Sequence, residues 1–259
     1  MNRFATAFAI LLTAAGTLQY QNDLGFDGTF EDAKKIQQGP PDNNQFVFAR
    51  LIYTGRIHGY YKGWYTDYPK GDRQLIQGLK RLTNLDIADK GRVVAINDPE
   101  LFRYPMVYSS EVGQMVLSMQ DAATMREYLQ RGGFWFMDDF WGSLEWESME
   151  AQMKKIFPHV QIKDIPPNHP MFHSFFDIEK VMQVPSAAYL YYGITYEQDG
   201  FAGECKGIFD DNGRLMVVIN HNTDLGDAYE WADDPDYPQR FTGYAYRHAL
   251  NIILYALSH

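Results

Sequence analysis

The stretch LQRGGFWFMDD, residues 129–139, carries the signals that decide the fold. Gly132-Gly133 predicts the end of a helix, because glycine accepts the left-handed backbone with which many helices end. Phe134 to Met137 are all apolar, and a short apolar run without alternation is typical of a strand buried on both faces. Asp138 and Asp139 follow directly. The stretch therefore predicts a helix, a buried strand and then a polar turn at the carboxyl end of that strand.

Helices and buried strands alternate in the same way on both sides of this stretch. Asp211-Asn212-Gly213 predicts a tight hairpin turn between the last two strands. A parallel sheet with helices on both faces produces such an alternation. We therefore predict the fold class α/β, as a single three-layer α/β/α sandwich with a mostly parallel sheet. The predicted strands are residues 46–53, 93–96, 106–108, 134–137, 203–209 and 214–219, and the predicted helices are residues 72–82, 119–130, 143–156, 169–176 and 241–257.

The N-terminus has the three parts of a secretory signal peptide. Arg3 lies in a short polar segment, Phe4 to Leu12 form an apolar run, and small residues follow at positions 14–16. The run is shorter than the ~20 residues that a membrane-spanning helix needs. We therefore predict cleavage, a periplasmic or secreted protein and no membrane span in the mature form; an amphipathic helix of a cytosolic protein is the alternative. The predicted parts of the chain are a signal peptide (1–16), a polar lead-in or linker (17–45) and one domain (46–259).

The composition of the 259-residue chain excludes several kinds of partner. Its formal net charge of −10 repels phosphate backbones, so nucleic acid is not an expected partner. Cys205 is the single cysteine and cannot form an intramolecular disulfide. Aromatic residues make up 15% of the chain, and exposed aromatic rings suit sugar faces or protein surfaces. The expected partner is therefore a small polar ligand or a periplasmic protein.

Ligands of open parallel sheets bind at the carboxyl edge, where the loops after the strands converge. Polar residues follow the predicted strands of this chain at that edge. We therefore predict a pocket for a small polar ligand, such as a glycan. The predicted ligand-binding residues are Tyr53, Gly55, Trp64, Asp67, Asn97, Ser109, Trp141, Asn222, Asp224, Asp227 and Trp231, and the candidate catalytic residues are Asp138, Asp139 and His221.

The adjacent carboxylates Asp138 and Asp139 allow two interpretations. A carboxylate at the rim of a buried strand needs a cation, a hydrogen-bond donor or a proton to offset its desolvation. In the functional interpretation, one of the two is a metal ligand or a general base. In the structural interpretation, Asp139 caps the following loop and Asp138 bonds to a neighbouring loop.

Residues 222–236 form an acidic stretch that can hold Ca²⁺ through oxygen ligands. Their spacing differs from that of an EF-hand loop, and a solvated loop is the alternative. No cofactor is identified from the sequence, and a divalent cation remains open. His169 and His173 have the i, i+4 spacing of a zinc helix, but Pro170 replaces the glutamate that such a motif requires. Cys205 has no strand-turn-helix elbow around it, so we expect it to pack in the core.

Three stretches resemble the bacterial family called domain of unknown function 4159: residues 64–69 (WYTDYP), 129–139 and 222–231 (NTDLGDAYEW). The resemblance covers about residues 46–258. The family is similar to the class I glutamine amidotransferases, which implies a flavodoxin-like three-layer sandwich and agrees with the alternation above. It implies no established activity.

The resemblance also bears on catalysis. Amidotransferases place a nucleophilic cysteine in a tight elbow after the strand that corresponds to residues 134–137. Here Asp138 and Asp139 occupy that place, and an aspartate cannot form the thioester that glutamine hydrolysis uses. His221 matches the position of the amidotransferase histidine. The chain is therefore not expected to be a glutaminase.

Three functions remain open from the sequence. The first is an exported amidotransferase-like domain that binds a small polar ligand. The second is a non-catalytic periplasmic binding or assembly module that uses exposed aromatic residues such as Trp64, Tyr65, Trp141 and Trp231. The third is a carboxylate- or metal-assisted hydrolase with Asp139 as the base and His221 as its partner.

Overall fold

The computed structural model describes residues 45–55, 63–159 and 161–259. The predicted signal peptide and all but the last residue of the predicted lead-in lie outside these residues. No helix of the described part of the chain has the length and apolar character to cross a membrane.

One sheet of seven strands lies at the centre of the molecule, in the order β2-β1-β3-β4-β7-β6-β5. The first five strands of this order are parallel, whereas β6 runs antiparallel to both β7 and β5. The chain leaves β1 toward β2 on one side and returns to β3 on the other, so the strand order reverses beside β1. The strands are β1 (Ala49–Ile52), β2 (Arg92–Ala95), β3 (Met106–Ser109), β4 (Phe134–Met137), β5 (Lys163–Asp164), β6 (Glu204–Phe209) and β7 (Leu215–His221).

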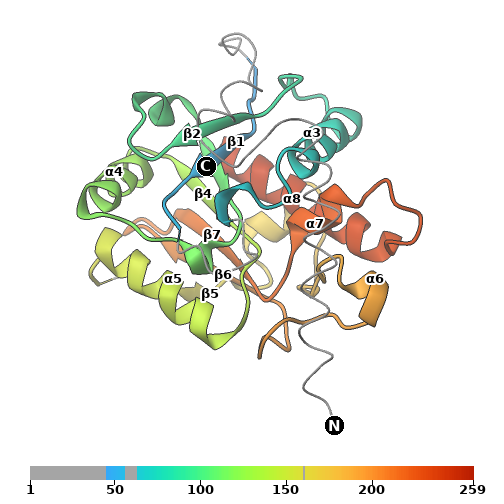
Figure 1. The fold of residues 1–259 in the computed structure, drawn as a ribbon. Coiled ribbons are helices and arrows are strands. Elements are labelled where there is room, and N and C mark those ends of the chain that lie inside the picture. Colours follow the sequence, from blue (N-terminus) through green and yellow to red (C-terminus); the bar gives the residue numbers. More distant parts are fainter. Residues whose placement is uncertain (1–44, 56–62, 160) are drawn as a thin grey trace.

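Helices cover both faces of the sheet (Figure 1). One face carries α4 (Met119–Gln130) and α5 (Gly142–Ile156), and the other carries α3 (Lys70–Leu82), α7 (Leu225–Glu230) and α8 (Gln239–Ser258). The α/β sandwich with a mostly parallel sheet is therefore confirmed. Short helices complete the described chain: α6 (Tyr189–Tyr192) and the 3₁₀ helices η1 (Gly63–Tyr65), η2 (Pro99–Arg103), η3 (Val112–Gln114) and η4 (Pro170–His173).

The local signals act as expected in most elements. Ser118 and Asp121 form a reciprocal capping box at the start of α4. Gly213 adopts a φ of 85° in the hairpin turn between β6 and β7. Two predictions need correction: residues 169–176 contain only the 3₁₀ helix η4, and the stretch after β7 contains α7 where a loop was one expectation. β5 and α6 were not predicted.

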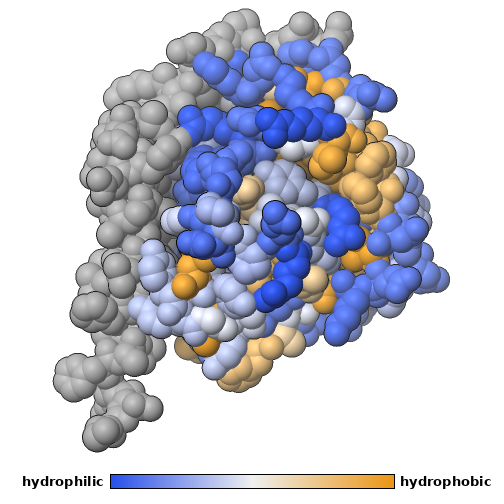
Figure 2. Space-filling model, turned by 90° about the vertical axis from the view of Figure 1, so that its right-hand side faces the viewer, coloured by the Kyte–Doolittle hydropathy of each residue, from blue (hydrophilic) through white to orange (hydrophobic). Residues whose placement is uncertain are grey.

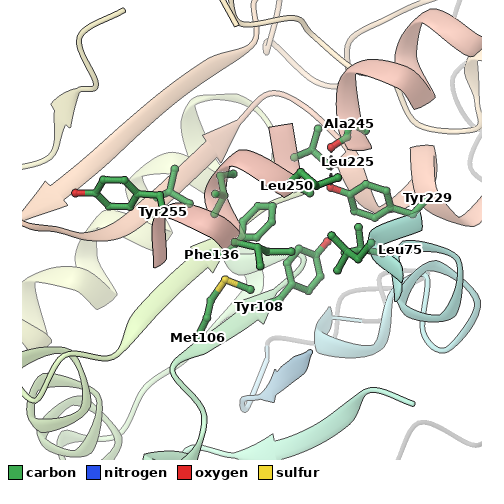
Figure 3. Close-up of a cluster of buried hydrophobic side chains, with 14 of the residues drawn as sticks. Leu75, Met106, Tyr108, Phe136, Leu225, Tyr229, Ala245, Leu250 and Tyr255 are labelled. Atoms are coloured by element: carbon green, nitrogen blue, oxygen red, sulfur yellow. Dashed lines mark hydrogen bonds between the residues drawn. The ribbon is translucent and has the colours of Figure 1, made fainter. Parts of the chain in front are cut away.

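Two apolar cores lie on opposite faces of the sheet. Strand residues alternate between them: Trp135 and Met137 of β4 join the core under α4 and α5, while Phe134 and Phe136 join the core under α3, α7 and α8. Figure 3 shows the second core, in which Tyr108 of β3 and Tyr229 of α7 lie close together. This packing brings α7 against the carboxyl ends of β3 and β4.

Arg50 is a charged residue inside the second core, only 1% exposed. Its guanidinium forms a salt bridge with Asp72 of α3 at 2.6 Å and lies over the ring of Tyr108. Nη1 donates to the carbonyls of Trp64 and Thr66 at 3.0 and 2.9 Å. Arg50 therefore ties β1 to α3 and to the turn that immediately precedes Asp67.

We predict that Asp72→Ala lowers the free energy of unfolding by about 3–5 kcal/mol, because it leaves the buried Arg50 guanidinium without its counter-charge. Urea denaturation measures the change. The matched control is Glu150→Ala, which breaks an exposed ion pair with Lys154 and should cost about 0.5 kcal/mol or less. Equal effects of the two substitutions would contradict the role given to the Arg50–Asp72 pair.

Candidate functional site

Buried carboxylates gather at the carboxyl edge of the parallel strands. Asp67 lies in the segment between β1 and α3, Glu111 follows β3, Asp139 follows β4, and Asp224 follows β7. Each of these residues is at most 8% exposed. The loops after the strands thus converge as the rule for open parallel sheets requires.

Two groups of carboxylates lie close enough to share an ion. Asp67, Asp139 and Asp224 form the first group, and Asp67, Asp227 and Glu230 form the second. Within each group, one oxygen of each residue lies within 4.8 Å of the others. Asp67 belongs to both groups and is therefore the centre of the cluster.

Asp67 is held in place by its backbone and by its neighbours. Its φ is 63°, and its carbonyl accepts the Gly71 N–H at 2.7 Å as α3 begins. A Cβ on Gly226 would overlap Asp67 Oδ2, so only glycine at this position of α7 lets the carboxylate approach. That oxygen is buried and has no hydrogen-bond partner among the residues that the structure describes.

The adjacent aspartates have different surroundings. Asp138 Oδ2 accepts the Leu225 and Gly226 N–H groups at 3.0 and 3.1 Å, and the Tyr108 hydroxyl at 3.0 Å. Asp138 thus bonds to the start of α7, where the structural interpretation expected a neighbouring loop. Asp139 accepts bonds from the Ser110 hydroxyl and Trp141 Nε1 and also belongs to the first carboxylate group.

Left-handed backbone is concentrated around the cluster. Asp67, Glu111, Asp139 and Asn222 have φ values of 63°, 55°, 56° and 57°. This conformation costs about 1–2 kcal/mol for most residues with a Cβ, although Asp and Asn tolerate it best. Asp139 lies in the segment 138–141 between β4 and α5, and its side chain lies with Asp67 and Asp224 at the edge of the sheet.

Hydrogen bonds of Asn222, Asp224 and Asp227 hold the loops around the carboxylate cluster in place. Asn222 Oδ1 accepts the Gly142 N–H at 2.8 Å, and its own N–H donates to the Phe140 carbonyl at 3.0 Å. Asp224 caps α7 by accepting the Asp227 N–H at 2.7 Å. Asp227 in turn accepts the Ala187 N–H and Trp231 Nε1. The loops after β4 and β7 are therefore locked together.

Burial raises the pKa of the carboxyls throughout the cluster. The pKa values of Asp67, Asp139 and Asp224 lie well above the usual range, first because of desolvation and second because neighbouring carboxylates repel added negative charge. Burial also raises the pKa of Asp138 to about 7, against the lowering effect of its hydrogen bond from Tyr108. The cluster therefore favours the binding of protons or of cations, which offset its negative charge.

His221 does not pair with Asp139 among the described residues. Its Nε2 lies 3.1 Å from the Gly142 carbonyl, and Nδ1 lies 3.3 Å from Glu204 Oε2. The ring packs against Phe140 and Trp146. His221 thus lies beside the loop after β4, with both ring nitrogens directed to groups other than Asp139.

The remaining predicted residues are distributed unevenly. The Tyr53 hydroxyl donates to the Ser110 and Glu111 carbonyls, and Ser109 Oγ accepts a hydrogen bond from Trp135 Nε1. Both residues therefore stabilise the end of β3 and the loop after it. Gly55 pairs with Met115 in an isolated bridge.

Asn97 is exposed after the outermost strand β2 and bonds to Asp121 of α4. Trp64 and Trp141 are buried, and Trp231 is half-buried.

Two acidic residues near the site were not named individually from the sequence, although the candidate Ca²⁺ stretch 222–236 includes Glu230. Glu230 lies within the stretch 222–231, and its i, i+3 spacing from Asp227 would have indicated a shared helical face. Glu111 follows the predicted strand exit at Ser109 and Ser110, but nothing in its neighbours signals burial. To predict that Glu230 and Glu111 are buried near the site, one would have had to know that α7 forms and in which order the strands lie in the sheet.

The other candidates from the sequence lie elsewhere. Cys205 is buried 3.9 Å from His248 Nε2, and burial raises the pKa of its thiol, so it packs in the core as expected. His173 pairs with Asp177. A cavity of about 680 Å³ lies at the opposite edge of the sheet, lined by residues such as Phe157, Lys163 and Met216, and contains none of the predicted site residues.

Comparison with known proteins gives one match. Residues 47–257 match the protein family described as a domain of unknown function (DUF4159). This confirms the resemblance that the three stretches indicate. No curated protein matches the chain.

The different surroundings of the two adjacent aspartates predict opposite effects of removing a charge. In the presence of a chelator, Asp138→Asn should lower the free energy of unfolding by about 1–3 kcal/mol. One orientation of the amide turns its N–H groups toward the three donors at Oδ2, and the other places them at Oδ1, where no acceptor is hydrogen-bonded among the described residues. Asp139→Asn should leave stability level or raise it, because repulsion within the cluster falls and Asn tolerates the left-handed backbone. Thermal and urea melts of both variants measure this; a similar loss in both would contradict it.

Proposed function

We propose that this chain, which belongs to the DUF4159 family of domains of unknown function, binds a divalent metal ion at the carboxyl edge of its sheet through Asp67, Asp139 and Asp224. The observation that carries the proposal is the juxtaposition of these three buried carboxylates within 4.8 Å. The buried Oδ2 of Asp67, which has no donor among the described residues, provides a second and independent argument.

The charge of the site favours a cation over a neutral or anionic ligand. Desolvating a carboxylate is costly unless a cation, a donor or a proton offsets it. Arg50 is the basic residue that lowers the pKa of Asp67, but its guanidinium is already paired with Asp72. A metal ion placed between the three carboxylates would supply the charge that the surrounding protein does not.

The donor atoms favour a hard metal ion. All the residues of both groups offer carboxylate oxygens, without imidazole or thiolate. Ca²⁺, Mg²⁺ and Mn²⁺ prefer such ligands, whereas Zn²⁺ and Cu²⁺ prefer nitrogen and sulfur. Two oxygens on opposite sides of a Ca²⁺ ion are about 4.6–5.2 Å apart for Ca–O bonds of 2.3–2.6 Å, so the spacing of the group suits an ion of this size or smaller.

A bound metal ion would also explain how this edge of the sheet could bind the small polar ligand that the sequence predicts. A metal ion held by Asp67, Asp139 and Asp224 would attract oxygen-rich molecules, among them glycans, because Ca²⁺ and Mg²⁺ bind oxygen ligands. Asp139 has a φ of 56° and is the second of four residues between β4 and α5; its left-handed turn shares the strained backbone of a nucleophile elbow, with a carboxylate in place of the nucleophile. This supports the amidotransferase-like relation and a binding role without a thioester. The predicted signal peptide supports action in the periplasm or outside the cell.

The alternative functions receive less support. Acid–base hydrolysis by Asp139 and His221 requires the two side chains to lie beside the same substrate atoms, but the ring nitrogens of His221 are directed to Glu204 and to the Gly142 carbonyl. An aromatic docking surface requires exposed tryptophans, but Trp64 and Trp141 are buried. On the face shown in Figure 2, hydrophobic residues lie in separate groups among hydrophilic ones. We therefore favour cation binding over both.

The first test is the effect of metal ions on thermal stability. An ion at about 100 times its Kd should stabilise the fold by about 2.7 kcal/mol, which corresponds to a rise in Tm of roughly 5–10 °C. We expect this rise with Ca²⁺, Mg²⁺ or Mn²⁺, its loss in Asp67→Asn and a clear reduction in Asp139→Asn. The matched control is Asp211→Asn in the exposed hairpin turn, which should keep the full rise. A wild-type Tm indifferent to all three ions would refute the proposal.

The second test is pH dependence. Because the folded-state pKa values are raised, the ion-free folded protein holds protons that the unfolded chain has released above about pH 4. This stability contribution is complete below the unfolded pKa and falls as the pH rises toward the folded pKa. For Asp138 the loss is complete near pH 7, whereas for Asp67, Asp139 and Asp224, whose pKa values lie well above the usual range, it continues at higher pH. In the presence of a chelator, Tm should therefore keep falling as the pH rises above about 7, and the rise in Tm caused by the metal should grow.

Two comparisons make the pH test specific. Asp67→Asn should show a flatter dependence of Tm on pH, because it removes one of the titrating groups. Burial lowers the pKa of His248 to about 4, so this residue is neutral in the folded state and mostly neutral in the unfolded state across the chosen range. A wild-type Tm that rises with pH in chelator would contradict the assignment of raised pKa values to the cluster.

A further inference from the structure

We infer that the site holds two divalent ions that share Asp67, one bound with Asp139 and Asp224 and the other with Asp227 and Glu230. This inference rests on the proposed function and adds a second ion to it. Its basis is that the two carboxylate groups have one member in common and otherwise consist of different residues.

The second group comes from a different part of the fold than the first. Asp227 and Glu230 lie three residues apart on α7, so their side chains share one face of that helix. Both are buried, at 8% and 5% exposure. α7 packs against α3, and the segment that precedes α3 carries Asp67. The face of α7 that bears Asp227 and Glu230 is therefore the face that meets Asp67.

The position of Asp67 suits a shared ligand. An ionised carboxylate has two oxygens and about four lone-pair sites, so it can bind two ions at once. Asp67 Oδ2 approaches the backbone of α7 at Gly226, between Asp224 of the first group and Asp227 of the second. This oxygen is the one that has no hydrogen-bond partner among the described residues.

Formal charge decides between one ion and two. The two groups contain five different carboxylates. If all are ionised, one divalent ion leaves a charge of −3 in a buried site, whereas two ions leave −1. A residual charge of −3 would demand protons on several oxygens. Two ions that share a carboxylate, about 3.5–4 Å apart as in known two-metal sites, offset the charge without them.

Manganese provides the test, because it is a hard divalent ion with a paramagnetic signal. Purified protein is titrated with Mn²⁺ by calorimetry, and the loaded sample is examined by electron paramagnetic resonance. We expect two Mn²⁺ per chain and a spin-coupled signal, since the ions share Asp67. Glu230→Gln should lower the affinity for one ion at least about tenfold, leaving one ion with an uncoupled signal. Asp139→Asn should do the same to the other ion, and Asp67→Asn should weaken both.

The outcomes separate this inference from the proposed function. One Mn²⁺ per chain in the wild type overturns the two-ion inference and leaves the proposed function standing; none overturns both. Two ions without spin coupling place the second ion elsewhere and also overturn the inference. Asp211→Asn serves as the control and should keep two coupled ions. If Glu230→Gln does not fold, Asp227→Asn replaces it, and the wild-type measurement decides the question without any variant.

Discussion

The burial of several like charges at one edge of the sheet is the constraint on which the rest of the structure depends. The parallel strands direct their loops to the same edge, and these loops bring Asp67, Asp139 and Asp224 together. In water these carboxylates would repel one another weakly, but at exposures of 4% or less the repulsion and the desolvation both become large. Such a cluster is stable only with protons or cations, so its chemistry follows from the topology.

The surrounding structure is organised to hold the charges in place. Arg50 is used in the core, where it anchors the turn before Asp67 through the Trp64 and Thr66 carbonyls. Asp138 accepts two N–H groups of α7 and so places that helix beside β4. The charged and polar residues that reinforce the site thus bond to backbone groups, while each carboxylate of the cluster keeps an oxygen within 4.8 Å of the others in its group.

The sequence predicted the framework of the fold better than the site. Apolar runs such as Phe134 to Met137 and the cap at Ser118 are local signals, and the structure confirms the elements that they indicate. The carboxyl-edge rule also identified Asp67, Asp139 and Asp224 as members of one region. It could not distinguish Asp138 from Asp139, because their roles differ through contacts with Leu225 and Gly226, which lie far along the chain. α7 was missed because its six residues are fewer than periodicity can reveal.

The turn at Asp139 separates what the backbone requires at this position from what the carboxylate adds. Four residues, 138–141, lead from β4 to α5, and the left-handed conformation of the second, Asp139, presents its side chain at the sheet edge. A cysteine there would need a base and an oxyanion site, whereas an aspartate needs only a counter-charge. Asn also tolerates this backbone, so conformation alone does not require an acid. What distinguishes aspartate is its charge, placed beside Asp224 and Asp67, and that charge is useful chiefly to a cation.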